Sequence, residues 1–135
     1  MFLAELTKDG HSAFLNLAVA LIKADGKVTQ DELNTLNMYK AEITGMRDIS
    51  EYGSDDIKGD INFFAELDLQ TRKKVYFELI SLAYTDSDYS DDEKKIIDSM
   101  IIKWKLDTYF CSEIDKVALD LTKAFGKLGE LISGW

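Results

Sequence analysis

The sequence predicts an all-α fold, and three observations carry this prediction. The chain has 135 residues and is 46% apolar, which suits one domain with a core of its own. It contains no proline, which favours long uninterrupted helices over a turn-rich β sandwich. Apolar residues recur at helical spacing along nearly the whole chain, and no segment alternates with the period of a strand. We therefore expect a single domain over residues 1–135, with about six or seven helices.

The first expected element is an apolar helix that begins near residue 13 and ends near Ala24. Its periodic positions are Phe14, Leu17, Ala18, Leu21 and Ile22, with Leu15 and Val19 widening the stripe. A helix that is apolar on most sides should be central and buried. Asp25-Gly26 is a typical stop and turn. The next helix should run from Thr29 to about residue 43, with Leu33, Leu36, Tyr39 and Ile43 on one face.

The middle of the chain opens with a polar stretch, residues 46–60, which we expect to be a connector. A helix should begin near Ser54 or Asp55, either of which can cap it. Its apolar stripe would be Ile57, Ile61, Phe64 and Leu67. Asp68 is expected to cap the following helix. The core face of that helix would be Val75, Leu79, Leu82 and Ala83, with Tyr76 and Ile80 alongside.

Two further helices complete the expected fold. One starts at Ser90 and carries Ile96, Ile97, Met100, Ile101 and Trp104. A break is expected at Lys105-Leu106-Asp107, and the last helix should cover about residues 112–132. The apolar end of this helix and the terminal tryptophan have two possible roles. They close the core of the domain, which is the interpretation we favour, or they bind a partner or a second copy of the chain. The residues in question are Phe125, Leu128, Leu131, Ile132 and Trp135.

An internal repeat links two of the turns between helices. Residues 21–36 align with residues 82–97 without a gap. The alignment places Asp25 on Asp86, Asp31 on Asp92, and Glu32 on Glu93. It predicts two helix–turn–helix halves, about residues 13–43 and 74–104, related by a pseudo-two-fold axis.

Helix capping accounts for much of this shared motif. T-Q-D-E and S-D-D-E are both capping boxes, in which Thr29 or Ser90 accepts from the backbone N–H three residues on. Glu32 or Glu93 then reaches back to the N–H of the capping residue. The dipole of the helix favours the extra first-turn acids, which are Asp31, Asp91 and Asp92.

Capping leaves Asp25 and Asp86 without a role. Each follows the C-terminal end of a helix, where the dipole disfavours a carboxylate. An Asx-turn is one remedy, and a bound cation is another. Calcium and magnesium prefer oxygen ligands, and the second turn is rich in them. It offers Asp86, Asp88 and Ser90, with Asp91 or Glu93 nearby.

Several familiar sites are excluded by position. An EF-hand needs oxygen ligands at its first and third positions, but the first turn has Leu21 and Lys23 there. The second turn has Leu82 and Tyr84, and a loop counted from Asp86 ends on Ile97 rather than Glu. A zinc site is poorly supported because His11 and Cys111 are the only histidine and cysteine. We expect Cys111 to be a small buried hydrophobe.

The sequence predicts no catalytic activity and a cytoplasmic protein. It has no P-loop, no glycine-rich dinucleotide motif, and no Ser/His/Asp set that can be placed together. The net charge of −9 argues against nucleic acid as a partner and favours cations or basic protein surfaces. The first residues do not resemble a signal peptide, and no apolar run is long enough to span a membrane.

Three segments carry a resemblance to a known family: ALIKADGKVTQDEL (20–33), LISLAYTDSDYSDDE (79–93) and LDLQTRKKVYFELISLAYTD (67–86). Together with the order of elements, they resemble the tellurite-resistance TerB family and the wider TerB-like superfamily over about residues 10–106. The resemblance implies an all-helical, pseudo-symmetric domain. It also implies a role as an adaptor or sensor in responses to tellurite and other stresses. Some members of the family associate with the inner membrane through partners.

In that family, paired acidic turns are proposed to bind a divalent metal. The matching positions here are Asp25, Asp31, Glu32, Asp86, Asp92 and Glu93. This chain departs from the pattern at Ser87, where the glycine of the first turn is replaced, and Asp88 is an added acid that can serve as a ligand.

The expected function is therefore a non-enzymatic, TerB-like stress-response module that binds a divalent cation, calcium or magnesium rather than zinc. Its expected partners are proteins, including other stress-response or membrane-associated proteins, and the chain is expected to be a monomer or a homodimer. The alternative is a helical protein-interaction scaffold in which the acidic turns only cap helices.

Overall fold

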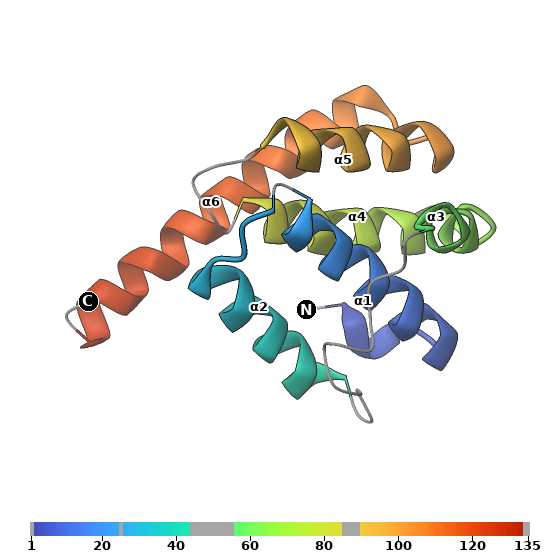
Figure 1. Cartoon of the computed structure of the whole chain (residues 1–135). Coiled ribbons are helices and arrows are strands. Elements are labelled where there is room, and N and C mark those ends of the chain that lie inside the picture. Colours follow the sequence, from blue (N-terminus) through green and yellow to red (C-terminus); the bar gives the residue numbers. More distant parts are fainter. Residues whose placement is uncertain (1, 25, 44–55, 85–89, 134–135) are drawn as a thin grey trace.

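A computed structural model describes residues 2–24, 26–43, 56–84 and 90–133, and within these ranges the chain is helical and contains no strand (Figure 1). The elements are η1 (Leu3–Glu5), α1 (Lys8–Lys23), α2 (Gln30–Glu42), α3 (Lys58–Ala65), α4 (Leu69–Ala83), α5 (Asp91–Lys103) and α6 (Thr108–Ser133). The predicted all-α class is confirmed.

Helix α1 lies at the centre of the molecule and packs against α3, α4 and α5. Its buried residues surround it on most sides, as its composition predicts: Gly10, Ala13, Phe14, Leu15, Leu17, Ala18, Val19, Leu21 and Ile22. The helix starts about five residues earlier than expected. The side chain of Thr7 caps it by accepting from the N–H of Gly10 at 3.1 Å. This local cap extends the helix beyond the apolar stripe that predicted it.

The short helix α3 begins later than the sequence suggests. It starts at Lys58, and its N-cap residue, Ile57, makes no capping hydrogen bond through its side chain. The side chain of Asp56 accepts from the N–H of Lys58 at 3.1 Å. The two residues expected to cap this helix, Ser54 and Asp55, lie outside the described residues.

Helices α4 and α5 match the prediction closely. Asp68 caps α4 by accepting from the N–H of Thr71. It also accepts from the Thr71 hydroxyl at 2.6 Å, and this second hydrogen bond is the main reason that the pKa of the Asp68 carboxyl is lowered. The predicted core face of α4 is buried throughout. Trp104 follows α5, is fully buried, and donates from Nε1 to the carbonyl oxygen of Ile61 at 2.7 Å. This bond ties the end of α5 to α3.

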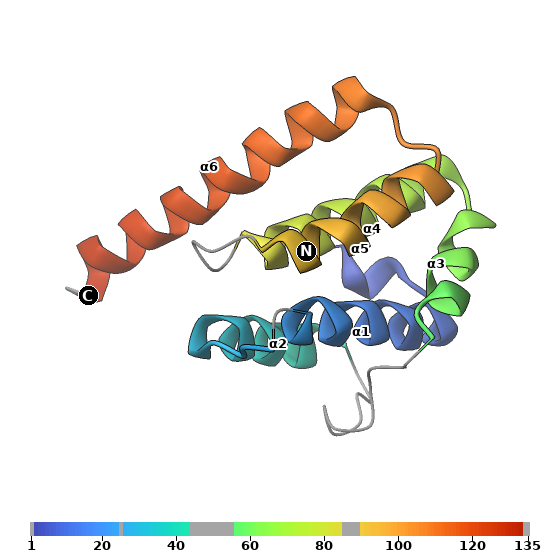
Figure 2. The same ribbon diagram turned by 45° about the horizontal axis from the view of Figure 1, so that its top comes forward.

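The chain then breaks at Lys105, which has a left-handed φ of 53°. Leu106 is buried behind it, so the predicted break is confirmed. Helix α6 begins at Thr108, four residues earlier than expected, and continues for 26 residues. Its first half packs on α4, and its second half runs past the body of the molecule (Figure 2).

Candidate functional site

The turn between α1 and α2 is closed by a complete capping box. Thr29 accepts from the N–H of Glu32 at 3.2 Å. Oε1 of Glu32 accepts in return from the N–H of Thr29 at 3.0 Å and from its hydroxyl at 3.1 Å. Glu32 is buried, with 4% of its surface exposed. Gly26 in this turn has a positive φ of 76°, as expected for a glycine that ends a helix.

The turn between α4 and α5 repeats this geometry. Ser90 accepts from the N–H of Glu93 at 3.1 Å. Oε1 of Glu93 accepts from the N–H of Ser90 at 3.3 Å and from its hydroxyl at 3.1 Å. Glu93 is as buried as Glu32, at 3% exposed. Both predicted capping boxes are therefore confirmed, and the repeat in the sequence is a repeat in structure at these two helix starts.

The residues predicted to hold a metal divide into three groups. Glu32 and Glu93 are buried and use one carboxylate oxygen for capping. Asp31 and Asp92 lie next to them and are exposed to solvent. Asp25, Asp86 and Asp88 lie outside the described residues. Within the described part of the chain, no three acidic, histidine or cysteine side chains are grouped to hold a metal ion.

A second candidate site lies on the outer half of α6. The side chains of Phe125, Leu128, Leu131 and Ile132 are 59%, 51%, 72% and 76% exposed. The prediction that these residues close the core of the domain is therefore wrong. The core is already filled by the helices that precede them, so α6 extends beyond it. Trp135, which was grouped with them, lies outside the described residues.

The outer half of α6 and the neighbouring helix α2 flank a groove. The groove has a volume of about 540 Å³. Its walls are Asp31, Asn34, Thr35 and Met38 from α2, and Phe125, Gly126, Leu128, Gly129, Ile132 and Ser133 from α6. Met38 is 69% exposed. Sequence reasoning missed this wall, because Met38 lies off the buried face of α2.

A second hollow of about 370 Å³ shares part of this wall and reaches inward to α4. Its lining includes Tyr39 and Glu42 from α2, and Phe77 and Glu78 from α4. The polar groups here serve the fold. Glu42 accepts from the N–H of Leu3 at 3.2 Å, and Glu78 accepts from the N–H of Phe2 at 2.8 Å.

Tyr39 also has a structural role. Its hydroxyl donates to the carbonyl oxygen of Glu78 at 3.2 Å. Burial, reinforced by the nearby charge of Glu78, raises the pKa of Tyr39 far above its usual value, so its hydroxyl stays protonated. The inner end of the groove is thus a wall of residues that also hold the fold together, and the exposed part lies between α2 and the end of α6.

The first half of α6 is anchored by a polar contact to α4. Tyr76 is fully buried and donates to Oδ1 of Asp115 at 2.7 Å. Burial raises the pKa of Asp115, although the hydrogen bonds from Tyr76 and Tyr84 oppose this shift. Cys111 lies one turn before Asp115 and is buried, as predicted, and burial raises the pKa of its thiol. This anchor holds α6 in a direction that projects its outer half from the body.

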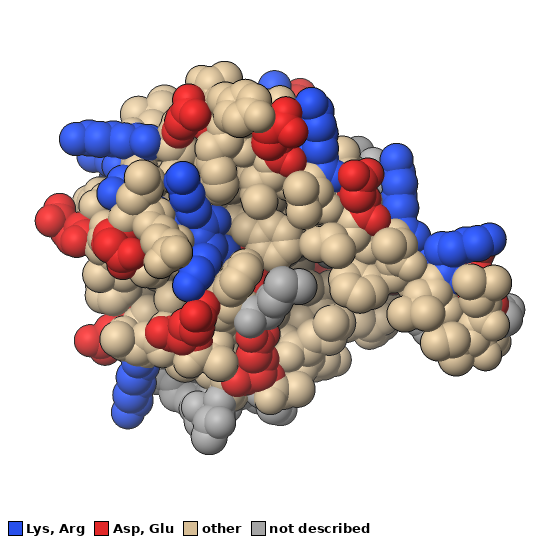
Figure 3. All heavy atoms as spheres, turned by 180° about the vertical axis from the view of Figure 1, so that it is seen from behind, with Lys and Arg blue, Asp and Glu red and all other residues tan. Residues whose placement is uncertain are grey.

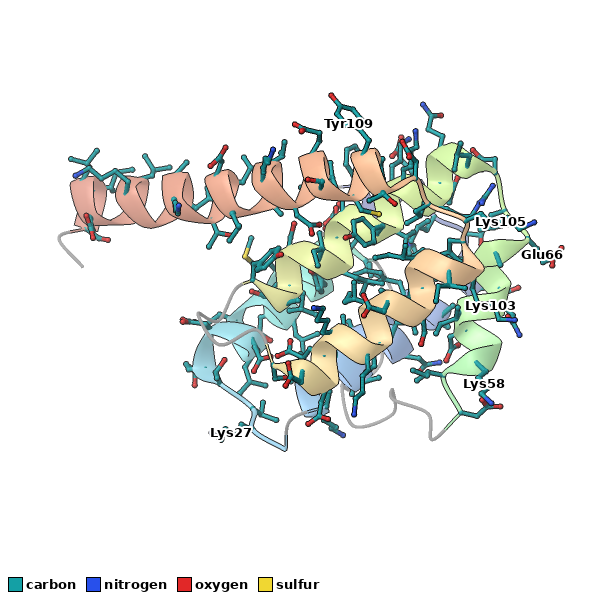
Figure 4. All side chains as sticks on the ribbon, turned by 90° about the horizontal axis from the view of Figure 1, so that it is seen from above. Lys27, Lys58, Glu66, Lys103, Lys105 and Tyr109 are labelled. Carbon is teal, nitrogen blue, oxygen red and sulfur yellow. The ribbon has the colours of Figure 1, made fainter. Side chains whose placement is uncertain are left out.

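One charged residue, Asp31, lines the groove among the residues that the structure describes. Surface that is neither acidic nor basic continues from the body onto the projecting end of α6, with charged side chains at its edges (Figure 3). The cationic side chains of Lys58, Lys103 and Lys105 lie at the opposite end of the molecule, near α3 and the end of α5 (Figure 4). The groove and this basic end are therefore separate surfaces.

No family model, curated protein or solved structure matches the chain. Among the described helices, none combines the length and the apolar character that crossing a membrane requires.

Proposed function

We propose that this chain is a non-enzymatic helical module that binds an amphipathic helix in the groove between α2 and α6. The observation that carries the proposal is the exposure of Phe125, Leu128, Leu131 and Ile132, each more than half exposed on one short stretch of helix. Scattered exposed apolar residues are common, but a continuous exposed apolar surface beside a groove is typical of an interaction site. This is the scaffold alternative that the sequence already suggests.

The shape of the groove supports a helix as its occupant. Two helices form its walls, and its volume of about 540 Å³ is the size of a pocket that takes a whole small molecule. Several side chains of a docked helix can therefore enter it. Such helices bind through apolar anchors spaced at i, i+3 or i+4, and i+7. The resemblance to TerB-like proteins supports a role for this module as an adaptor in stress responses.

The proposal is tested by selecting helix-forming peptides from a displayed library against the full chain at low concentration. We expect the enriched peptides to share an apolar stripe at i, i+3 or i+4, and i+7. Their binding should be lost with Phe125→Asp or Met38→Asp, and should be kept with Ile102→Asp. Ile102 is a matched control because it is 76% exposed on α5, far from the groove. Enrichment without such a stripe, or binding that survives both groove substitutions, contradicts the proposal.

The repeated acidic turns favour a second candidate function, which is divalent cation binding in a TerB-like stress response. The supporting observation is that two equivalent turns each place an exposed acid, Asp31 or Asp92, beside a buried glutamate. Cation binding at one or both turns would then alter how the two halves of the molecule present a partner surface. Calcium and magnesium remain the ions expected from the oxygen ligands.

Calorimetric titration with calcium, magnesium, manganese and zinc tests this second candidate. We expect saturable binding of calcium or magnesium below millimolar concentration, weakened by Asp25→Asn and Asp86→Asn. Asp98→Asn is the control, since Asp98 is an exposed acid on α5 outside the turn. The candidate fails if no ion binds, or if the double variant binds as well as the wild-type chain.

A further inference from the structure

The apolar stripe on the outer half of α6 is wider than the groove that it lines. Phe125, Leu128 and Ile132 face the groove, but Leu131 is not part of its wall. Leu131 directly precedes Ile132, so it points roughly 100° away from it around the helix axis. A single helix laid in the groove would cover one flank of α6 and leave Leu131, which is 72% exposed, in water.

We propose that the occupant of the groove is α6 of a second copy of this chain, so that the protein is a two-fold symmetric dimer. This inference rests on the proposed function, because it names the helix that the groove receives. Each outer half lies between α2 and α6 of the other copy. The interface is then a row of four helices in the order α2, α6 of the second copy, α6, and α2 of the second copy. Such an interface uses the same surface of both copies and closes on itself.

The dimer accounts for both flanks of α6. One flank, with Phe125 and Ile132, meets the inserted α6 of the second copy. The other flank, with Leu131, meets α2 of the second copy, where Met38 is 69% exposed. The groove and the helix that fills it are thus present in the same chain, and one symmetric contact covers both.

Charge does not oppose this contact. The chain has a net charge of −9, but residues 122–133 of α6 carry one acid, Glu130, and two lysines, Lys123 and Lys127. Lys127 and Glu130 approach each other at 4.0 Å and are both well exposed. Glu130 lies on the face away from the apolar stripe. Lys127 lies at the edge of the stripe, one turn before Leu131, where its long side chain can keep its charge in water when the stripe is covered.

The exposed area is close to what a stable dimer needs. The side chains concerned are Met38, Phe125, Leu128, Leu131 and Ile132, each between 51% and 76% exposed. At roughly 150–200 Å² for a large side chain, they offer on the order of 600 Å² of mostly apolar surface per copy. A standard interface buries about 800 Å² on each partner, and the polar groove residues of α2 can supply the remainder.

Light scattering and sedimentation of the full chain over a concentration series test the dimer. The expected result is a molar mass that approaches twice 15.3 kDa with increasing concentration. Ile132→Asp and Leu131→Asp should each weaken the dimer roughly 10- to 100-fold, since each places a charge in the interface. Ile102→Asp is the matched control, because Ile102 and Ile132 are equally exposed at 76% and both lie on helices. It should leave the dimer unchanged.

Circular dichroism of Ile132→Asp, Leu131→Asp and Ile102→Asp at low concentration checks that each variant folds. We expect all of them to fold, because the substituted side chains are already exposed in the single chain. A chain that stays monomeric at all concentrations overturns the dimer but leaves the peptide selection free to succeed, so the two proposals fail separately. A dimer that Ile132→Asp does not weaken overturns the inference, since the contact then lies elsewhere. A dimer sensitive to Ile132→Asp but not to Leu131→Asp overturns the four-helix row.

Discussion

Glu32 and Glu93 each stabilise the start of their own helix. Each is nearly fully buried, although an acid is rarely buried without partners. Each accepts two hydrogen bonds from the residue that starts its helix, one from the backbone and one from the hydroxyl. The same arrangement at both copies of the repeat shows that the repeated motif starts a helix in each half.

The capping role predicts a stability cost at Ser90. Ser90→Ala should lower the free energy of unfolding by about 1 kcal/mol, because the N–H of Glu93 and the carboxylate of Glu93 both lose a partner. Urea unfolding measures the change. Ser99→Ala is the control, since the hydroxyl of Ser99 only bonds back to its own helix at Lys95 and is exposed. Equal stability of the two variants would count against a capping role for Ser90.

Asp115 predicts a dependence of stability on pH. Burial raises its folded-state pKa above the unfolded value of about 3.9. The folded state therefore binds this proton more tightly than the unfolded state does. The resulting stabilisation is fully present below the unfolded pKa and is lost as the pH rises through the folded pKa.

Asp115→Asn removes this titration but keeps an oxygen that can accept from Tyr76. We expect the free energy of unfolding of the wild-type chain to fall relative to that of the variant as the pH is raised from about 4 towards neutrality. Urea unfolding of both proteins across this range gives the difference. A difference that is constant with pH, or that changes in the opposite direction, rules out a raised pKa at Asp115.

These residue-scale features differ in how far the sequence predicts them. Both capping boxes are predictable because donor and acceptor lie three residues apart. The contact between Tyr76 and Asp115 joins residues 39 positions apart, and no local pattern indicates it. Three of the predicted metal residues lie outside the described residues, so metal binding at the turns stays a prediction.

At the scale of elements, α6 shows which structural features the spacing of apolar residues predicts and which it does not. The spacing of its apolar residues predicts a helix, and a helix forms. The same spacing does not say whether the stripe is covered by the chain itself or by another molecule. Only the packing of α6 on α4 shows where the body of the domain ends, which is why the expectation of a core role for Phe125 and its neighbours fails.

Gly59 and Gly126 are helical glycines with open space at the Cβ position, and we expect their substitution by alanine to have the opposite effect from that of Gly26 in the first turn. Gly126 lies in α6 with open space where a Cβ would stand. Gly126→Ala should raise the free energy of unfolding of the dilute chain by about 0.5–1 kcal/mol, since alanine favours the helix. Gly59→Ala in α3 should behave alike, because its Cβ position is also open.

Gly26→Ala should instead destabilise the chain, because Gly26 has a φ of +76° that a Cβ disfavours. Thermal unfolding compares the three variants under the same conditions. A loss of stability with Gly126→Ala in the dilute chain would show that α6 is not a regular helix at this point.

Removing the outer half of α6 tests whether the body folds without it. A chain that ends at Lys123 should still unfold cooperatively, with a free energy of unfolding within about 1 kcal/mol of the dilute full chain, because the removed side chains are mostly exposed. Urea unfolding followed by circular dichroism measures this. Loss of cooperative unfolding would mean that residues 124–133 belong to the core after all.

At the scale of the whole molecule, a complete core surrounds α1, and one helix extends from it. Fully buried side chains from η1, α1, α3, α4 and α5 fill this core, among them Leu3, Phe14, Phe64, Tyr76 and Met100. The all-α class and the central place of α1 follow from composition and periodicity. The groove cannot be predicted in this way, because it depends on the angle at which α6 packs on α4 and passes α2.

Amide hydrogen exchange over residues 122–133 tests the central claim most directly, which is that the outer half of α6 is an interface between two copies. We predict that these amides exchange at least about 10-fold more slowly in concentrated than in dilute protein, because the second copy protects them. The amides of α1 should not change, and Ile132→Asp should remove the effect. Exchange over residues 122–133 that is equally fast at every concentration would contradict the claim.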